Sequence, residues 1–209
     1  MLCHAYRTIL VHVPKTAGQS IEMVFLGKLN LVWEERAPLL LQPNRDPTRG
    51  PPRLAHLYAS EYVGLGHVRP ETFASYFKFG VVRNPWARAV SEYKFAYRPR
   101  GVPFRAFLGE VIGRRRGVVE ARHIDPQVQF LCAADGTRMV DRVLRYESLA
   151  SEFAEVSQAI FGEAHSLPMR NVSRDRTDYR VFYDDDSRQF IAKAYRDDVR
   201  TFGYEFDDG

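Results

Sequence analysis

The chain has 209 residues, of which 45% are hydrophobic and 27% are charged. These values exclude a disordered chain, a collagen-like repeat and a disulfide scaffold, and the length suits one globular domain over residues 1–209. The formal net charge is +4, and only five of the 30 basic residues are lysine. Because the arginine guanidinium pairs well with phosphate, sulfate and carboxylate, this composition favours an anionic partner. No zinc finger, leucine zipper or RNA-binding aromatic motif points to a nucleic acid.

Cysteine usage and hydropathy indicate the compartment. Cys3 and Cys132 are far apart and form no metal-binding spacing, which predicts free thiols in a reducing environment. No apolar run approaches the roughly 20 residues that cross a bilayer. The first residues also lack the basic segment and long apolar run of a signal peptide. We therefore expect a cytoplasmic protein without a membrane segment.

The first predicted elements form a strand, a loop and a helix. Residues Thr8–Val13 are β-branched and apolar, as in a strand buried on both faces of a parallel sheet. Pro14–Gly18 then predicts a loop, and Gln19–Leu26 predicts a helix that Gly27 closes. This order is typical of the opening of a βαβ unit.

A second strand and helix follow a long loop. Gln42–Arg53 is rich in proline, glycine and arginine and has no periodicity, which predicts a surface loop that can serve as a lid. Lys78–Arg83 predicts a second buried strand. Asn84 is the expected N-cap, and Pro85 the first residue, of a helix that runs to about Tyr97.

The remaining elements continue the alternation. Asp141–Glu147 predicts a third strand, and Ser148 is expected to cap a helix that ends near Gly162. Apolar residues from Ile191 to Phe202 recur at helical spacing. Strands that alternate with helices predict an α/β fold, with a central parallel β-sheet flanked by helices as in P-loop NTPases.

Two segments carry the candidate chemistry. The loop before the first helix presents unpaired backbone N–H groups and the positive end of the helix dipole, and Lys15 adds a full charge. Thr16 and Ser20 add hydroxyl groups, so the loop suits a phosphate or phosphosulfate. It is not a Walker A loop, because there the lysine follows the glycines. Arg83 ends the second strand, and with Ser91 it can bind a second anionic group.

These two segments, PKTAGQS at 14–20 and VVRNPWARAVSEY at 81–93, resemble the cofactor motifs of sulfotransferases that use 3′-phosphoadenosine 5′-phosphosulfate. The similarity is to the branch that contains carbohydrate and heparan sulfate 2-O-sulfotransferases, and Gln19 departs from its usual small hydroxyl residue. The resemblance spans nearly the whole chain through weaker segments: Gly66–Val68, His123–Gln127, Leu144–Glu147, Asn171–Arg174 and Phe202–Tyr204.

The resemblance implies how the donor is bound. The 3′-phosphate falls to Arg83 and Ser91, and the segment with Ser173 and Arg174 also approaches the nucleotide. The 5′-phosphosulfate falls to one loop, whose residues are Pro14, Lys15, Thr16, Ala17, Gly18, Gln19 and Ser20.

The same resemblance, together with side-chain chemistry, suggests the catalytic residues. His67 is the expected base, because a histidine titrates near neutrality and can accept a hydroxyl proton. Lys15 is expected to stabilise the leaving phosphate. Arg69 and His123 are candidates for binding the acceptor, which is expected to be a carbohydrate. No metal constellation is evident, and sulfuryl transfer is expected to need no metal.

Two other functions stay open at this point. A P-loop kinase shares the strand, loop and helix, but the Walker A order and an evident magnesium-binding aspartate are missing. A binding module would hold the nucleotide without turnover. The presence of Lys15 and His67 argues against such a module.

Overall fold

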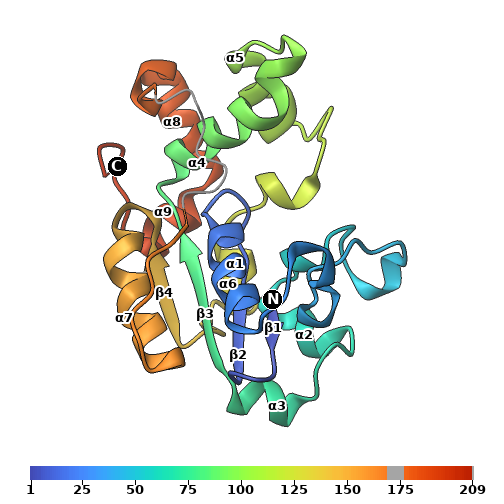
Figure 1. Ribbon diagram of the computed structural model, residues 1–209. Helices are drawn as coiled ribbons and strands as arrows, with labels where there is room; N and C mark the ends of the chain where they lie inside the picture. Colours follow the sequence, from blue (N-terminus) through green and yellow to red (C-terminus); the bar gives the residue numbers. More distant parts are fainter. Residues whose placement is uncertain (169–176, 209) are drawn as a thin grey trace. The chain divides into compact units, whose positions relative to one another are not determined.

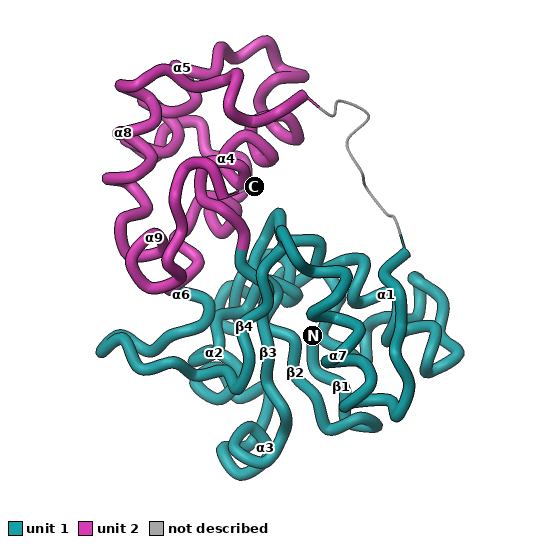
Figure 2. The backbone as a smooth tube through the Cα atoms, turned by 90° about the vertical axis from the view of Figure 1, so that its left-hand side faces the viewer, with its two compact units in different colours: residues 1–82, 129–171 teal, residues 83–128, 172–209 magenta. Residues whose placement is uncertain are grey.

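The computed structural model describes residues 1–168 and 177–208. The chain forms two compact units (Figures 1 and 2). Unit 1 comprises Met1–Val82 and Gln129–Asn171, and unit 2 comprises Arg83–Val128 and Val172–Gly209. Both units are therefore built from two stretches of chain. The prediction of a single domain over residues 1–209 stays a prediction.

Among the described residues, unit 1 contains a four-stranded sheet with the order β1-β2-β3-β4. Its strands are β1 (Leu2–Cys3), β2 (Thr8–Val11), β3 (Phe77–Val82) and β4 (Arg142–Arg145). β2, β3 and β4 are parallel, and β1 pairs with β2 in the antiparallel direction. The predicted parallel sheet is thus confirmed, with an antiparallel edge strand that the sequence pattern did not indicate. The carboxyl ends of the three parallel strands lie at one edge of the sheet.

Helices are distributed over both units. Unit 1 has α1 (Gly18–Lys28), α2 (Ala59–Gly64), α3 (Pro70–Ser75) and α7 (Leu149–Phe161). Unit 2 has α4 (Pro85–Glu92), α5 (Phe104–Ala106), α8 (Asp185–Ala194) and α9 (Arg196–Phe202). α6 (Val128–Leu131) begins at Val128, which is assigned to unit 2, and its other residues are assigned to unit 1. None of the helices in the described part of the chain is long and apolar enough to cross a membrane.

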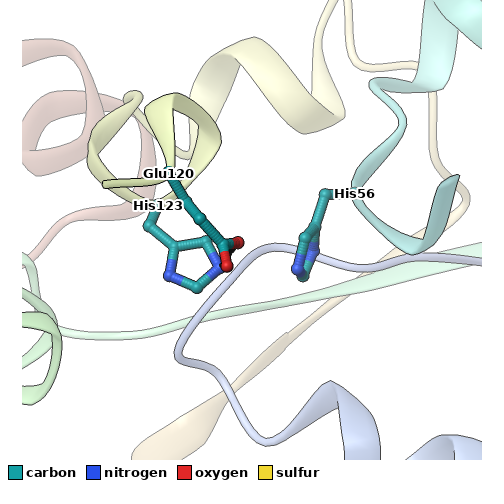
Figure 3. A group of neighbouring side chains, drawn as sticks. All are labelled: His56, Glu120 and His123. Carbon is teal, nitrogen blue, oxygen red and sulfur yellow. Dashed lines mark ion pairs between the residues drawn. The ribbon is translucent and has the colours of Figure 1, made fainter. Parts of the chain in front are cut away.

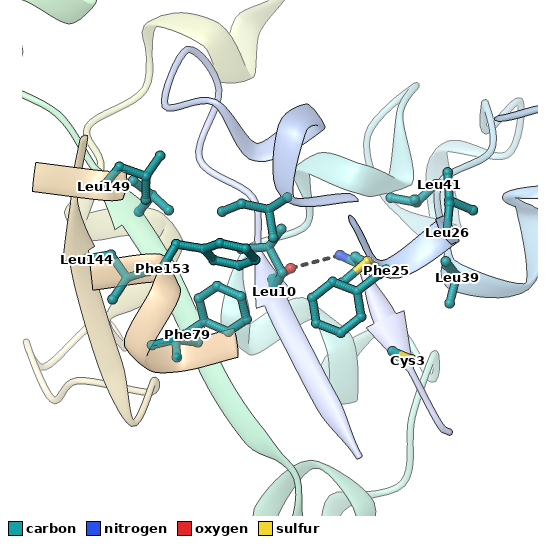
Figure 4. Close-up of a cluster of buried hydrophobic side chains, with 14 residues drawn as sticks. Cys3, Leu10, Phe25, Leu26, Leu39, Leu41, Phe79, Leu144, Leu149 and Phe153 are labelled. Carbon is teal, nitrogen blue, oxygen red and sulfur yellow. Dashed lines mark hydrogen bonds between the residues drawn. The ribbon is translucent and has the colours of Figure 1, made fainter. Parts of the chain in front are cut away.

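One buried cluster holds the sheet of unit 1 together (Figure 4). Leu10, Phe79 and Leu144 contribute from the three parallel strands, and Phe25 and Phe153 contribute from α1 and α7. Removal of this apolar area from water is the main stabilising term, at about 25 cal/mol per Å². Both helices therefore pack on one face of the sheet.

The end of α1 differs from the prediction. Gly27 lies inside the helix, and Asn30 adopts the left-handed conformation instead, with φ 54°. The amide of Leu31 donates to the carbonyl of Leu26 (2.9 Å), and that of Asn30 donates to the carbonyl of Gly27 (3.1 Å). This is a Schellman motif, in which asparagine can replace the more common glycine.

Other helix ends agree in part with the predictions. The Asn84 side chain accepts hydrogen bonds from the amides of Trp86 (3.0 Å) and Ala87 (3.2 Å), so the expected N-cap of α4 is confirmed. Beyond Glu92 the helix continues to Tyr97 as a wider, π-helical turn. Ser148 precedes α7 but does not cap it, because its hydroxyl is bonded to the Glu152 carboxylate.

The last predicted helix is split in the structure. α8 and α9 are separated at Tyr195, which has φ −115° and ψ 33°. The Tyr195 side chain is buried, and its hydroxyl donates to the carbonyl of Ile124 at 2.9 Å. The helical spacing of the apolar residues did not predict this break, which coincides with the hydrogen bond from Tyr195 to Ile124.

Candidate functional site

The loop after β2 leads into a helix whose first turn is open to an anion. α1 begins at Gly18 with Ala17 at the N-cap, so no side chain caps it and its first turn contains no acidic residue. The first amides of such a helix point outward and carry the positive end of the helix dipole. Together with the half-buried Lys15, this geometry suits a phosphate-like group.

The same loop contains two residues in a costly backbone conformation. Lys15 has φ 71° and Ala17 has φ 66°, the left-handed region that costs residues other than glycine about 1–2 kcal/mol. The Thr16 hydroxyl donates to the carbonyl of Val13 at 2.8 Å, so its proton is used inside the loop. Such strain clusters at ligand-binding sites. We conclude that Thr16 shapes the loop and that any contact from it to an anion comes from its backbone.

A buried histidine–carboxylate pair lies next to the loop. His12, which directly follows β2, contacts the Glu22 carboxylate from α1, with 2.6 Å between Nδ1 and Oε1. His12 is 8% exposed and Glu22 is 2% exposed. This pair was not predicted from the sequence. A signal was present, because Glu22 stands among Ile21, Phe25 and Leu26 on the buried face of the helix, and a buried carboxylate requires a partner.

Gly18 is the residue that lets the loop close over His12. A Cβ atom at position 18 would lie 2.2 Å from Cδ2 of His12, and Glu22 holds this ring in place. We expect Gly18→Ala to lower the free energy of unfolding by about 1–3 kcal/mol, as overpacking does elsewhere. Urea denaturation followed by circular dichroism measures this change.

Gly27→Ala is the matched control, because it lies in the same helix and a Cβ atom there would meet nothing within 4 Å. We expect it to raise the free energy of unfolding by about 0.5–1 kcal/mol, the usual gain from alanine over glycine in a helix. A Gly18→Ala variant as stable as the parent would show that the His12 ring can move aside.

Arg83 and Ser91 both belong to unit 2. Arg83 directly follows the last residue of β3 and precedes the N-cap of α4. Ser91 is half-buried and lies two turns into α4. The prediction that both residues bind one anionic group remains untested. Ser173 and Arg174 lie outside the described residues.

His67 and Arg69 lie in unit 1, between α2 and α3. His67 is half-buried, and its Nε2 is 2.7 Å from the carbonyl oxygen of Arg49. Because a carbonyl only accepts, Nε2 carries a proton and donates it to this oxygen. Nδ1 is buried and has no hydrogen-bond partner in the described ranges. Arg69 is exposed and stands at the N-terminus of α3.

The predicted surface loop Gln42–Arg53 supplies the carbonyl that His67 binds. An isolated bridge between Pro43 and Arg53 closes the loop at its base. Within it, the Asn44 side-chain amide donates to the carbonyls of Asp46 (2.8 Å) and Gly50 (3.0 Å). The loop is therefore tied internally, and the contact between Arg49 and His67 fastens it to the chain between α2 and α3.

His123 is held from two sides in unit 2. Its Nδ1 is 2.9 Å from the Glu92 carboxylate, and its Nε2 is 2.8 Å from that of Glu120 (Figure 3). Burial would lower the pKa of His123, but the hydrogen bonds and charges of Glu120 and Glu92 outweigh burial and raise it above its usual value. Its predicted role in binding the acceptor stays a prediction, and it requires an acceptor that displaces a carboxylate.

The raised pKa of His123 predicts a pH-dependent stability. Because the folded value exceeds the unfolded value of about 6.5, the pairing stabilises the fold fully below that pH and is lost as pH rises through the folded value. We expect the difference in unfolding free energy between the parent and His123→Gln to shrink with rising pH, and Glu120→Gln to reproduce part of the effect. Urea titrations at a series of pH values measure it. A difference that does not change with pH would contradict the paired imidazolium.

In a mostly parallel α/β sheet, a strand that leads into a helix N-terminus without a side-chain cap, beside a lysine, is typical of proteins that bind anions. The chain belongs to the sulfotransferase family, whose family model matches residues 1–205. Membership in this family indicates a transferase that moves a sulfuryl group to a hydroxyl-bearing acceptor. Sulfotransferases generally use 3′-phosphoadenosine 5′-phosphosulfate as the donor. No curated protein and no solved structure matches the chain significantly.

Proposed function

We propose that this protein transfers the sulfuryl group of 3′-phosphoadenosine 5′-phosphosulfate to a carbohydrate hydroxyl, as in the branch that contains the 2-O-sulfotransferases. The observation that carries the proposal is the start of α1. An uncapped helix N-terminus, without acidic residues in its first turn, follows a parallel strand and a lysine. This arrangement fits the 5′-phosphosulfate, and it supports the proposal that the first βα turn acts as a P-loop-like element.

The donor is proposed to bind at two places. The loop from Pro14 to Ser20 would hold the 5′-phosphosulfate through backbone amides and Lys15. Arg83 and Ser91 would hold the 3′-phosphate, with help from Ser173 and Arg174. A guanidinium can form two parallel hydrogen bonds with one phosphate. Two such anion-binding places would favour a ligand with two separated anionic groups.

The donor supplies an activated sulfur atom. In the proposed reaction, the acceptor hydroxyl gives its proton to His67, and its oxygen bonds to sulfur. The bond between sulfur and the bridging phosphate oxygen breaks, and the electron pair leaves with the 5′-phosphate. Lys15 stabilises the negative charge that develops on this phosphate. The product nucleotide is 3′-phosphoadenosine 5′-phosphate.

His67 can act as the base only after a local rearrangement. Its Nε2 carries the proton and is bonded to the Arg49 carbonyl, while its Nδ1 is buried. We propose that the loop Gln42–Arg53 moves away as a lid and that Nε2 then gives its proton to solvent, while Nδ1 takes up a proton in exchange. The lone pair of Nε2 then faces the acceptor hydroxyl in place of the carbonyl and accepts its proton. Arg69, which is exposed close to His67 in the chain, would contact the acceptor.

Calorimetry of the purified protein tests the donor site. We expect 3′-phosphoadenosine 5′-phosphate to bind without a metal ion, in the presence of EDTA. Arg83→Ala should weaken this binding about 10- to 100-fold, the usual value of hydrogen bonds to a charged group. The control is Arg196→Ala, which removes an exposed arginine of the same unit whose side chain pairs with Asp197.

The outcomes separate the proposed activity from its rivals. A preference for ATP with Mg²⁺ over the bisphosphate would favour a P-loop kinase. Binding of the bisphosphate without sulfuryl transfer to any of a panel of mono- and oligosaccharides would favour a binding module. Equal losses in Arg83→Ala and Arg196→Ala would contradict the role of Arg83. The cytoplasmic location stays a prediction.

A further inference from the structure

One buried side chain holds the backbone of Arg83 from both sides. The Arg83 amide donates to Oε1 of Gln127 at 2.9 Å, and Nε2 of Gln127 donates to the Arg83 carbonyl at 2.8 Å. Gln127 is fully buried. The side-chain amide thus makes the two hydrogen bonds that a neighbouring strand would make. Arg83 needs them, because the pairing of β3 with β4 ends at Val82.

Gln127 is itself held by a buried carboxylate. Asp198 of α9 is fully buried and accepts hydrogen bonds from the amides of Gln127 and Val128, both at 2.9 Å. Burial raises the pKa of Asp198, while the positive charge of Arg88 and these hydrogen bonds oppose the increase. The Asp198 side chain therefore fixes the backbone from which Gln127 reaches Arg83.

The segment before Gln127 is also fixed, from α4. The buried Arg88 guanidinium donates to the carbonyls of Asp125 (2.9 Å) and His123 (3.0 Å). The stretch from His123 to Val128 is therefore held by side chains of two helices, α4 and α9. All of these contacts lie within unit 2.

We propose that Gln127 is a positioning residue that directs the Arg83 guanidinium toward the 3′-phosphate of the donor, with Asp198 holding Gln127 in place. This inference rests on the proposed function. Because the Arg83 backbone is bonded at both its amide and its carbonyl, its backbone torsion angles are restrained, and these angles set the direction in which the side chain leaves Cα. A binding group that is misplaced by about 1 Å loses much of its effect.

Gln127→Met tests the proposal, since methionine has a similar length and makes neither hydrogen bond. Calorimetry compares 3′-phosphoadenosine 5′-phosphate with adenosine 5′-phosphate, which lacks the 3′-phosphate. We expect the variant to bind the bisphosphate about tenfold more weakly and the monophosphate within about twofold of the parent. In an Arg83→Ala background, Gln127→Met should cause no further loss.

Other outcomes would overturn the proposal. If Gln127 had a purely structural role, Gln127→Met would lower the affinity for both nucleotides equally. If Gln127 acted independently of Arg83, Gln127→Met would also lower the affinity for the bisphosphate in the Arg83→Ala background. A parent protein that does not prefer the bisphosphate would instead refute the proposed donor site, and the positioning role with it. If Gln127→Met does not fold, Gln127→Glu keeps an acceptor for the Arg83 amide but places a carboxylate oxygen where Nε2 donates to the Arg83 carbonyl. This variant should again lower the affinity for the bisphosphate but not for the monophosphate, and it should have no effect in the Arg83→Ala background.

Discussion

Lys15→Met is expected to lower kcat for sulfuryl transfer by about 10²- to 10³-fold, the usual cost of removing one group that stabilises transition-state charge. Methionine keeps most of the side-chain length but has no ammonium group. The negative charge that develops on the leaving 5′-phosphate then loses its cation. Turnover is measured as release of 3′-phosphoadenosine 5′-phosphate, with the best acceptor from the panel of saccharides.

Lys28→Met is the matched control, because Lys28 is the basic residue in the last turn of α1, the helix that follows the Lys15 loop, and pairs with Glu163. It removes the same charge at the opposite end of α1, and we expect kcat to stay unchanged. A Lys15→Met variant with unchanged kcat and a higher KM for the donor would show that Lys15 binds substrate and transition state equally.

His67→Ala is expected to lower kcat by about 10²- to 10⁴-fold, the range for loss of a general base. The affinity for 3′-phosphoadenosine 5′-phosphate should stay within about twofold of the parent, because a base contacts the acceptor and not the donor nucleotide. Added imidazole should restore part of the turnover, since it can enter the space that the ring leaves. Steady-state kinetics with and without imidazole measure both effects.

His4→Ala is the control for His67→Ala, because His4 is exposed and its Nδ1 is bonded to the Tyr76 hydroxyl. We expect it to leave kcat unchanged. Full turnover by His67→Ala would eliminate His67 as the base. The next candidate would then be His12, whose Nδ1 is already bonded to the buried Glu22 carboxylate.

Much of unit 1 was predictable because local patterns agree with the fold. β2, β3 and β4 are buried strands of a parallel sheet, and such strands appear as continuous apolar runs. The N-cap at Asn84 was also predictable, since a capping side chain acts only on the next few residues. β1 has only two residues, which is too short for any periodicity to indicate it.

Two helix ends differ from the prediction, one with local hydrogen bonds and one beside a contact that is distant in the chain. Glycine is the more common residue at the C-terminal end of a helix, but α1 continues through Gly27. Asn30 closes the helix instead, through the hydrogen bonds of the Schellman motif. The break at Tyr195 coincides with a hydrogen bond from its hydroxyl to Ile124, 71 residues earlier in the chain. Propensity is a weak term beside such tertiary contacts.

The sequence alone was enough to predict which segments hold the candidate functional residues. A lysine in a loop between a buried strand and a helix, and an arginine at the end of the next strand, are local features with local physical reasons. Only the tertiary structure decided what supports them. Glu22 meets His12 because a loop folds back, and Gln127 meets Arg83 across 44 residues. Buried polar groups must find partners wherever the topology brings them together, so such pairs leave no regular spacing in the sequence.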